Sequence, residues 1–330
     1  MRKLGPLAGA LALLGGTIVF ANEIKTEPKV ETTATSTADA AIAKDIKKDL
    51  VLEFDGDIYP KKQFPENCGE LLHGGKCDAK PLGTMHLESK KEGTVVYSKS
   101  TFSDAEMLQV TEESWEEDGH VLRVSIDNNV QKKVFELEVK DNKVFYKITD
   151  KVNGSVKTSV EDAEADLVVP STILSYIGNK LGDLAAGKEV KVKVAAIDHQ
   201  EAFTFTLKKY RMEKTLSGDP VMVLELKAKS FFVRSVVDPM FLYIGKDGEL
   251  VGFEGKSPLR QKDGDKYKEL TVRVGYHYVT DLLKPNFQLT AGMCDDTNNK
   301  TGMTKCEIPG APTSAPAASS SIASPTPQAN

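Results

Sequence analysis

The chain has 330 residues and a formal net charge of −5, with 28% charged and 40% hydrophobic residues. A mildly acidic chain without a basic block lacks the charge that nucleic acids attract, so no nucleic acid is expected as a partner. The hydrophobic fraction allows a sizeable core, whereas both ends differ from globular sequence, so we expect one folded unit of about 200 residues.

Residues 1–21 have the pattern of an export signal. Arg2 and Lys3 precede an uncharged apolar run, residues 4–20, and the small residue Ala21 follows. This order is typical of a secretory signal peptide, with cleavage after Ala21. The run is also close to the minimum length of a spanning helix, so an uncleaved anchor is the alternative, although its glycines weaken such a helix. Cleavage predicts a periplasmic protein without a stable membrane anchor.

The next two segments differ in character. Residues 22–37 contain almost no large apolar side chain and are expected to form a disordered linker. Within residues 38–86, an apolar residue at every fourth position from Ile42 to Leu50 predicts a short amphipathic helix. The remainder of that segment contains glycine, proline and two cysteines without a sustained period, which favours an irregular, disulfide-linked cap.

The four cysteines form two local pairs, Cys68 with Cys77 and Cys294 with Cys306. In an oxidising compartment this spacing predicts two disulfides, although four cysteines allow three pairings. A metal site is the alternative, but it would need closer cysteine spacing or converging histidines, and only His73 lies inside a cysteine loop. We therefore predict disulfides, with no metal site and no cofactor.

Residues 87–283 are dominated by alternation of apolar and polar residues, which is typical of strands with one buried face. The clearest alternating runs are 122–126, 135–139, 144–148 and 270–278. Dipeptides that tolerate positive φ predict hairpin turns at Asp118-Gly119, Asp141-Asn142 and Asn153-Gly154. The run from Val221 to Leu226 is apolar on both faces, apart from one glutamate, as in a strand covered on both sides. The fold class is therefore mainly β: an antiparallel meander that forms a curved sheet or half-open barrel.

One helix interrupts the strands. Ser171 or Thr172 can cap it after Pro170, and its apolar stripe comprises Ile173, Leu174, Ile177, Leu181, Leu184 and Ala185 before Gly187. An amphipathic helix needs an apolar surface, and a curved sheet provides one. Beyond the strands, residues 284–308 are expected to form a second disulfide loop, and the Pro/Ala/Ser-rich residues 309–330 a disordered tail.

The sequence shows no catalytic constellation. The string at residues 255–259, GKSPL, lacks the second glycine of a serine-hydrolase nucleophile turn, and the five histidines are scattered. Paired glycosidase carboxylates can be distant in sequence, but the acidic run at residues 112–118 is more typical of a solvated face. An enzyme that acts on envelope polysaccharides stays open as an alternative, as does a structural or adaptor protein.

Aromatic residues are frequent on the expected strands. They line a concave apolar surface for a lipid or other hydrophobic ligand, or else fill an ordinary core, and the core is the favoured interpretation. The residues in question are Trp115, Tyr146, Phe203, Phe205, Tyr243, Phe253, Tyr276 and Tyr278.

Residues 167–278 carry Val169-Pro170, the string RSVVDP at 234–239, and FEGKSPLR at 253–260 followed by Asp263-Gly264 and a closing strand. In these motifs the chain resembles a family of uncharacterised bacterial exported proteins, predicted to be periplasmic and without an assigned activity. The family usually has asparagine where this chain has Pro258. More loosely, the expected architecture is similar to half-open β-barrels that carry lipids or lipoproteins in the periplasm.

The polar residues of these motifs are the candidate binding residues: Arg234, Asp238, Ser257 and Arg260. No catalytic residue is assigned. The predicted function is that of a non-catalytic, exported β-sheet protein that binds a hydrophobic envelope ligand or an envelope protein. The oligomeric state, the identity of the ligand and the role of the tail do not follow from the sequence.

Overall fold

The computed structural model describes residues 49–235, 237–264, 266–281 and 289. The expected signal peptide, linker, second disulfide loop and tail all lie outside these residues, as do Cys294 and Cys306. The expected helix of residues 42–50 also lies outside them, except for Asp49 and Leu50, which belong to a strand instead.

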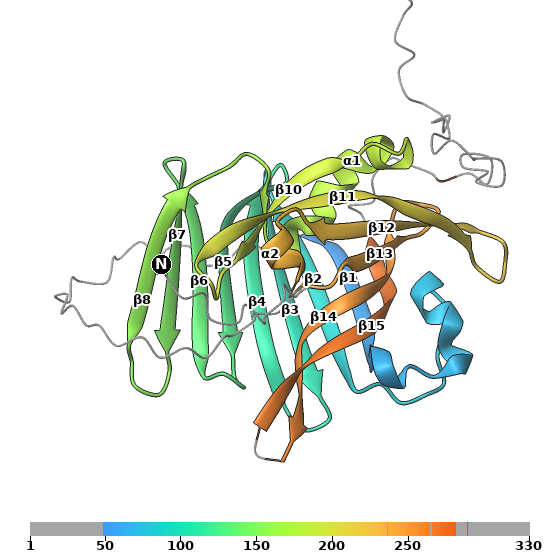
Figure 1. Ribbon diagram of the computed structural model, residues 1–330, viewed down its shortest axis with the longest axis horizontal. Coiled ribbons are helices and arrows are strands. Elements are labelled where there is room, and N and C mark those ends of the chain that lie inside the picture. Colours follow the sequence, from blue (N-terminus) through green and yellow to red (C-terminus); the bar gives the residue numbers. More distant parts are fainter. Residues whose placement is uncertain (1–48, 236, 265, 282–288, 290–330) are drawn as a thin grey trace, which may run out of the picture.

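The described residues form a single open sheet of fifteen strands, with the order β8-β7-β6-β5-β4-β3-β2-β1-β15-β14-β13-β12-β11-β10-β9 (Figure 1). All neighbours are antiparallel except β9 and β10, which confirms the predicted mainly β fold. The strands are β1 (Asp49–Pro60), β2 (Gly83–Glu92), β3 (Val95–Asp104), β4 (Leu108–Glu117), β5 (His120–Asn128), β6 (Lys133–Lys140), β7 (Lys143–Asp150), β8 (Val156–Asp162), β9 (Leu167–Val168), β10 (Val190–Ala196), β11 (Glu201–Lys214), β12 (Pro220–Ala228), β13 (Met240–Ile244), β14 (Leu250–Asp263) and β15 (Lys266–Asp281).

The sheet consists of two meanders that meet at β1 and β15. The first runs outward from β1 to β8, and the second returns from β10 to β15, so the first and last described strands pair with each other in the middle of the sheet. Phe54 of β1 lies opposite Tyr278 of β15, for example. Because this pairing joins residues more than 200 positions apart, it makes the two halves one continuous surface.

Tight turns form where positive φ angles are tolerated. Asp118 and Gly119 both have positive φ, as do Asp141 and Asn142, which confirms these two predicted hairpins. At the third predicted turn only Gly154 has positive φ. The local sequence therefore directs the first meander, because each turn returns the chain beside the strand it has just left.

The sheet curls so that its two ends approach each other without pairing. β9 contacts β5 of the other half. Near the end of the sheet, Ser159 of β8 donates to the carbonyl of Gln200, 3.0 Å away, and the side-chain amide of Gln200 donates to the carbonyl of Lys157. These bonds hold the edge strand β8 near the turn between β10 and β11 and give the sheet its half-open shape.

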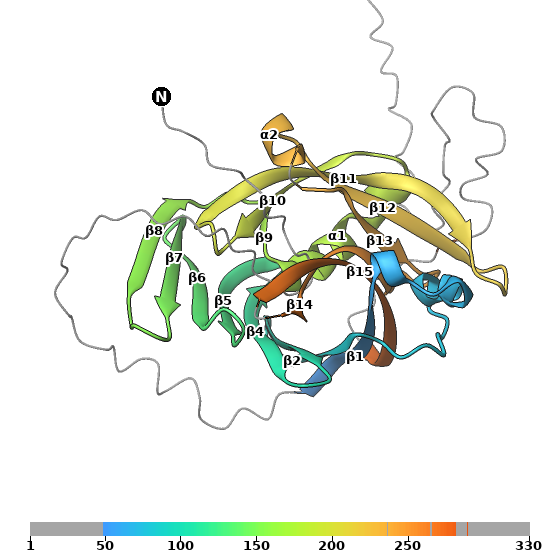
Figure 2. The ribbon, with the colours of Figure 1, turned by 60° about the horizontal axis from the view of Figure 1, so that its bottom comes forward.

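Two helices accompany the sheet: α1 (Ile173–Ala185) and the one-turn helix α2 (Phe231–Arg234). α1 lies inside the curve of the sheet, and α2 lies on the side of β11 and β12 that faces away from α1 (Figure 2). The predicted cap of α1 is wrong: the Thr172 hydroxyl bonds to Val169 within the 3-10 turn η3 (Pro170–Thr172) and caps no helical N–H.

A cap made of two 3-10 helices covers part of the other face of the sheet. They are η1 (Lys61–Gln63) and η2 (Glu66–His73), and a disulfide joins Cys68 to Cys77 as predicted. The cap starts later than expected, because β1 continues to Pro60. Leu72 of the cap packs into a small second core with Val221, Val223, Tyr243 and Val251. This core explains why residues 221–226 are apolar on both faces.

The cap approaches the sheet at two glycines that lie opposite each other, Gly252 of β14 and Gly275 of β15. A Cβ on Gly252 would lie 2.6 Å from the Leu72 carbonyl oxygen, and one on Gly275 would lie 2.7 Å from that of Leu71. Both positions are therefore restricted to glycine, because a side chain would displace the η2 backbone.

Candidate functional site

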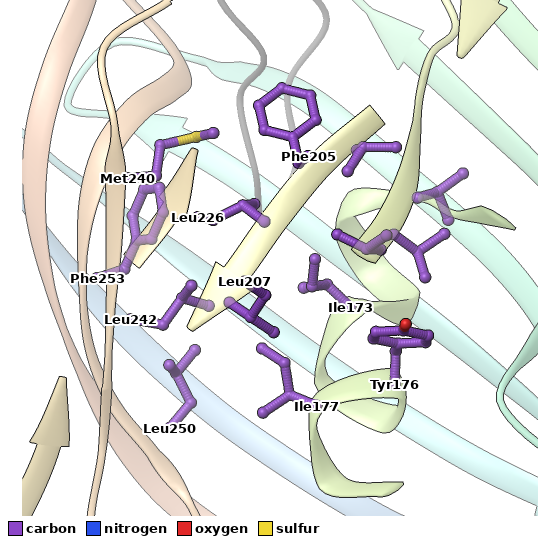
Figure 3. Packing of buried hydrophobic residues seen from close by; sticks show 14 of the residues in the cluster. Ile173, Tyr176, Ile177, Phe205, Leu207, Leu226, Met240, Leu242, Leu250 and Phe253 are labelled. Carbon is purple, nitrogen blue, oxygen red and sulfur yellow. The ribbon is translucent and has the colours of Figure 1, made fainter. Parts of the chain in front are cut away.

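The candidate site is the interior of the curved sheet, which α1 covers. The apolar stripe of the helix is buried there, and Figure 3 shows Ile173 and Ile177 pointing towards Leu207. The same apolar surface continues through Leu242 and Leu250 on the neighbouring strands. The interior is thus a large apolar surface to which a single 13-residue helix is fitted.

The aromatic residues mainly fill this core. Of the eight singled out in the sequence, Tyr146, Phe205, Phe253 and Tyr276 are buried in it, and Tyr243 is buried in the second core under the cap. A cavity of about 10 Å³ lies beside Phe253 and Tyr276, and a space of that size holds about one water molecule. Its lining includes Ile58, Met85, Phe102, Phe253, Ser257 and Tyr276. In the present conformation, this part of the interior is therefore packed with side chains.

A row of polar side chains interrupts the apolar surface on β2, β3 and β4. The row consists of three cross-strand pairs: Ser89 lies opposite Ser98, Ser98 opposite Ser114, and Ser100 opposite Glu112. The hydroxyls of Ser89 and Ser98 are 2.7 Å apart. We call this row, together with Glu116, the Ser/Glu patch.

The Ser/Glu patch lies beneath the start of the helical segment. Ser175 of α1 donates a hydrogen bond to Glu116, and Ser171 of η3 lies beside Glu112. No hydrogen bond of good geometry joins Ser171 to Glu112, and neither carboxylate oxygen of Glu112 has a partner among the described residues. A buried carboxyl group without a partner is costly when charged, so this end of the helical cover is its weaker end.

Burial sets the protonation of both carboxyl groups. It raises the pKa of Glu112 to about 7, against a smaller opposing effect of Ser171. It also raises the pKa of Glu116 to about 7, against the opposing effect of the Ser175 hydroxyl. Both groups therefore change charge near neutral pH, directly under the helical cover.

The expectation that the acidic run lies on a solvated face is wrong for these two residues. β4 alternates, with Glu112, Ser114 and Glu116 buried and Glu113 and Glu117 on the other face. The signal was present in the sequence, since Val110, Glu112, Ser114 and Glu116 share one phase of the strand. Carboxylates on an inner face contradict the usual rule of burial, so this phase does not by itself predict that they are buried.

Glu112 and Glu116 lie on one face of the same strand, four residues apart, so their Cα atoms are separated by about 13 Å. Within the described part of the chain, no group of three or more His, Cys, Asp and Glu residues could hold a metal ion.

The four candidate binding residues fall into two places. Arg234 and Asp238 are exposed in the segment that contains α2, whereas Ser257 is buried and Arg260 half-buried on β14. Ser257 accepts a hydrogen bond from the backbone N–H of Leu259 where the register of β14 against β15 shifts. Ser257 therefore shapes the strand locally, at the irregularity in the pairing of β14 with β15.

Arg260 joins the two halves of the sheet. Its backbone N–H and carbonyl bond to the side chain of Gln109 on β4, at 2.9 and 3.0 Å, and its guanidinium lies 3.3 Å from Glu269. Nearby, burial raises the pKa of Asp198 well above its usual range, although Arg260 opposes this shift. These contacts are internal to the fold and give Arg260 a structural role.

Comparison with known proteins is limited to structural similarity. No family model and no curated protein matches the sequence. A β-barrel-like protein of the domain of unknown function DUF1849 from Brucella abortus is 10% identical, with a TM-score of 0.35, over 70% of this chain and 97% of that one. MucB, in its complex with MucA(peri), is 11% identical, with a TM-score of 0.14, over 69% and 89%. Similarities this low assign neither a family nor a function.

Among the described residues, no helix is both long enough and apolar enough to cross a membrane.

Proposed function

We propose that this protein is a non-catalytic binding protein of the periplasm that takes a hydrophobic envelope ligand onto the concave face of its sheet. The observation that carries the proposal is the large apolar inner face, interrupted at the Ser/Glu patch, to which one short helix is fitted as a cover. Removing the helix would expose this face, and an exposed apolar face of that kind binds apolar molecules.

The Ser/Glu patch supports the proposal, because it makes the cover movable. Most of the inner contact of α1 is apolar and close-packed, but Glu112 and Glu116 meet the start of the helical segment as buried acids. When they lose their protons, two charges lie under the helix, and the neighbouring Ser171 and Ser175 offset only part of the cost of burying them. Ionisation therefore favours conformations in which this end of the cover lifts and water reaches the carboxylates.

The test is binding of an apolar fluorescent probe and of fluorescent phospholipid between pH 5 and pH 8, with native mass spectrometry of protein purified from the periplasm. We expect binding to increase as the pH rises through about 7. In the double variant Glu112→Gln with Glu116→Gln, binding should no longer depend on pH in this range. The proposal would be refuted if the protein bound neither the probe nor phospholipid at any pH and no ligand co-purified with it.

A protein partner is the second candidate, and the free edge of β8 favours it. In β8, the backbone N–H and C=O groups of the odd-numbered residues point towards β7. Two hydrogen bonds at the ends of the strand show this: Asp150 N–H donates to the carbonyl of Ser155, and Ala163 N–H donates to the carbonyl of Asn142. Those of the even-numbered residues therefore point away from the sheet, where a peptide strand can add.

Two exposed valines flank this edge. Val156 and Val160 are 53% and 54% exposed, on either side of Thr158. Proline at position 158 would remove an outward N–H and leave the bonds to β7 intact. We expect Thr158→Pro to abolish cross-links from a photoreactive residue at position 160 in cells, without loss of thermal stability. Cross-links that persist would exclude strand addition.

A further inference from the structure

The one-turn helix α2 exposes two neighbouring phenylalanines. Phe231 is 72% and Phe232 69% exposed, and their ring centroids lie 6.1 Å apart. Large aromatic side chains are normally withdrawn from water, so two adjacent exposed rings mark a contact surface. The helix lies on the outside of the sheet, away from α1 (Figure 2).

The inner side of the α2 turn is packed against the rest of the protein. Val233 and Val237 are buried and belong to the main core. The exposure of the two phenylalanines is therefore a feature of an ordered turn whose inner side is packed against the rest of the protein.

The backbone of the turn is hydrogen-bonded internally. Four successive carbonyl groups accept bonds: Ser230 from Arg234 N–H, Phe231 from Ser235 N–H, Phe232 from the Ser235 hydroxyl, and Val233 from Val237 N–H. Their lengths are 2.9, 3.1, 2.7 and 2.8 Å. Unpaired carbonyl groups oppose insertion into an apolar interface, because their desolvation costs free energy. The four carbonyl groups of this turn avoid that cost because they are already hydrogen-bonded.

The segment that carries the two rings has a charge opposite to that of the whole chain. Residues 227–238 contain three cations, Lys227, Lys229 and Arg234, and one acid, Asp238, which gives 3 − 1 = +2 in a chain of net charge −5. Lys229, Arg234 and Asp238 are exposed. Aromatic rings flanked by Lys and Arg match the boundary of an anionic lipid layer, where rings sit among the headgroups and cations meet phosphates.

We propose that α2 and its flanking basic residues dock this protein onto an anionic lipid surface. The small area of the surface favours lipid over protein, because a stable protein interface buries about 800 Å² on each partner, far more than two rings on a single projecting turn supply. The proposal is independent of a ligand inside the sheet, since α2 and α1 lie on opposite sides of β11 and β12.

The experiment is flotation of the processed protein with vesicles of phosphatidylglycerol and phosphatidylethanolamine, compared with vesicles of phosphatidylcholine. The N-terminus is checked by mass spectrometry, because an uncleaved apolar leader would bind vesicles by itself. The test variants are Phe231→Ala with Phe232→Ala, and Lys229→Glu with Arg234→Glu. The matched control is Leu216→Ala, which removes a side chain that is 88% exposed in the β11–β12 hairpin.

We expect wild type and Leu216→Ala to bind the anionic vesicles equally. Each phenylalanine that enters the lipid contributes at least about tenfold in affinity, so the double alanine variant should lose at least tenfold. Charge reversal should also weaken binding about tenfold or more, and added salt should weaken wild type. Thermal unfolding of all variants should match wild type, because these side chains are exposed.

Three results would overturn the proposal: no binding of wild type to anionic vesicles, equal binding to neutral vesicles, or a double alanine variant within twofold of wild type. The Glu112→Gln and Glu116→Gln variants leave α2 unchanged, so the flotation assay does not depend on ligand binding inside the sheet. If no ligand bound inside the sheet, the results expected for the vesicles would stay the same. The two ideas can therefore fail separately.

Discussion

Replacing Glu112 by glutamine should stabilise the protein, and more so as the pH rises. Glutamine has nearly the shape of the protonated carboxyl group but cannot ionise. In the folded protein the pKa of Glu112 is raised from 4.5 to about 7 by burial. Above pH 4.5, the unfolded chain therefore releases a proton that the folded chain retains, and the free energy of unfolding falls as the pH rises.

The magnitude follows from the two pKa values. The interval of about 2.5 between them, at about 1.4 kcal/mol for each pH unit, corresponds to about 3 kcal/mol once the pH exceeds 7. At pH 5 the free energy of unfolding has fallen by only about 1 kcal/mol. Glu112→Gln should therefore gain about 2 kcal/mol more over wild type at pH 8 than at pH 5. Adding Glu116→Gln should increase this difference further, because its pKa is raised in the same direction.

Denaturant unfolding at pH 5, 6, 7 and 8, under oxidising conditions, measures the effect. The control is Glu138→Gln, which removes one carboxylate at an exposed position of β6 and leaves the Ser/Glu patch unchanged. If the difference between Glu112→Gln and wild type does not change between pH 5 and pH 8, Glu112 is not buried as an uncharged acid. The account of the Ser/Glu patch would then be wrong.

Three further outcomes concern the cap and the helix. Replacing Cys68 and Cys77 by serine should lower the free energy of unfolding by about 2 to 3 kcal/mol, measured by denaturant unfolding, because the disulfide closes a loop between residues nine positions apart. Gly275→Ala should cost about 1 to 3 kcal/mol and expose the cap to protease, since a Cβ would meet Leu71; unchanged proteolysis would contradict this contact. Gly178→Ala in α1, where nothing lies within 4 Å of the added Cβ, should instead raise the thermal midpoint, because alanine favours helix by up to about 1 kcal/mol.

The two buried glutamates show where local sequence patterns reach their limit. Residues 110–116 alternate between the two faces of β4, but their order along the chain does not say which face is inner. That choice depends on the apolar residues of β3 and β5 on either side and on the position of α1. Likewise, Arg260 and Gln109 are 151 residues apart, and no local pattern links them.

The sequence by itself determined the clearest alternating strands after residue 87, the turns at Asp118-Gly119 and Asp141-Asn142, and the single long helix, because each depends on neighbours a few positions away. It also determined the disulfide of the cap, whose cysteines are close along the chain. Only the tertiary structure decided that β1 pairs with β15, that α1 covers two buried acids, and that α2 faces outward. These features depend on contacts between distant residues, and their free energy belongs to the assembled sheet rather than to any segment of it.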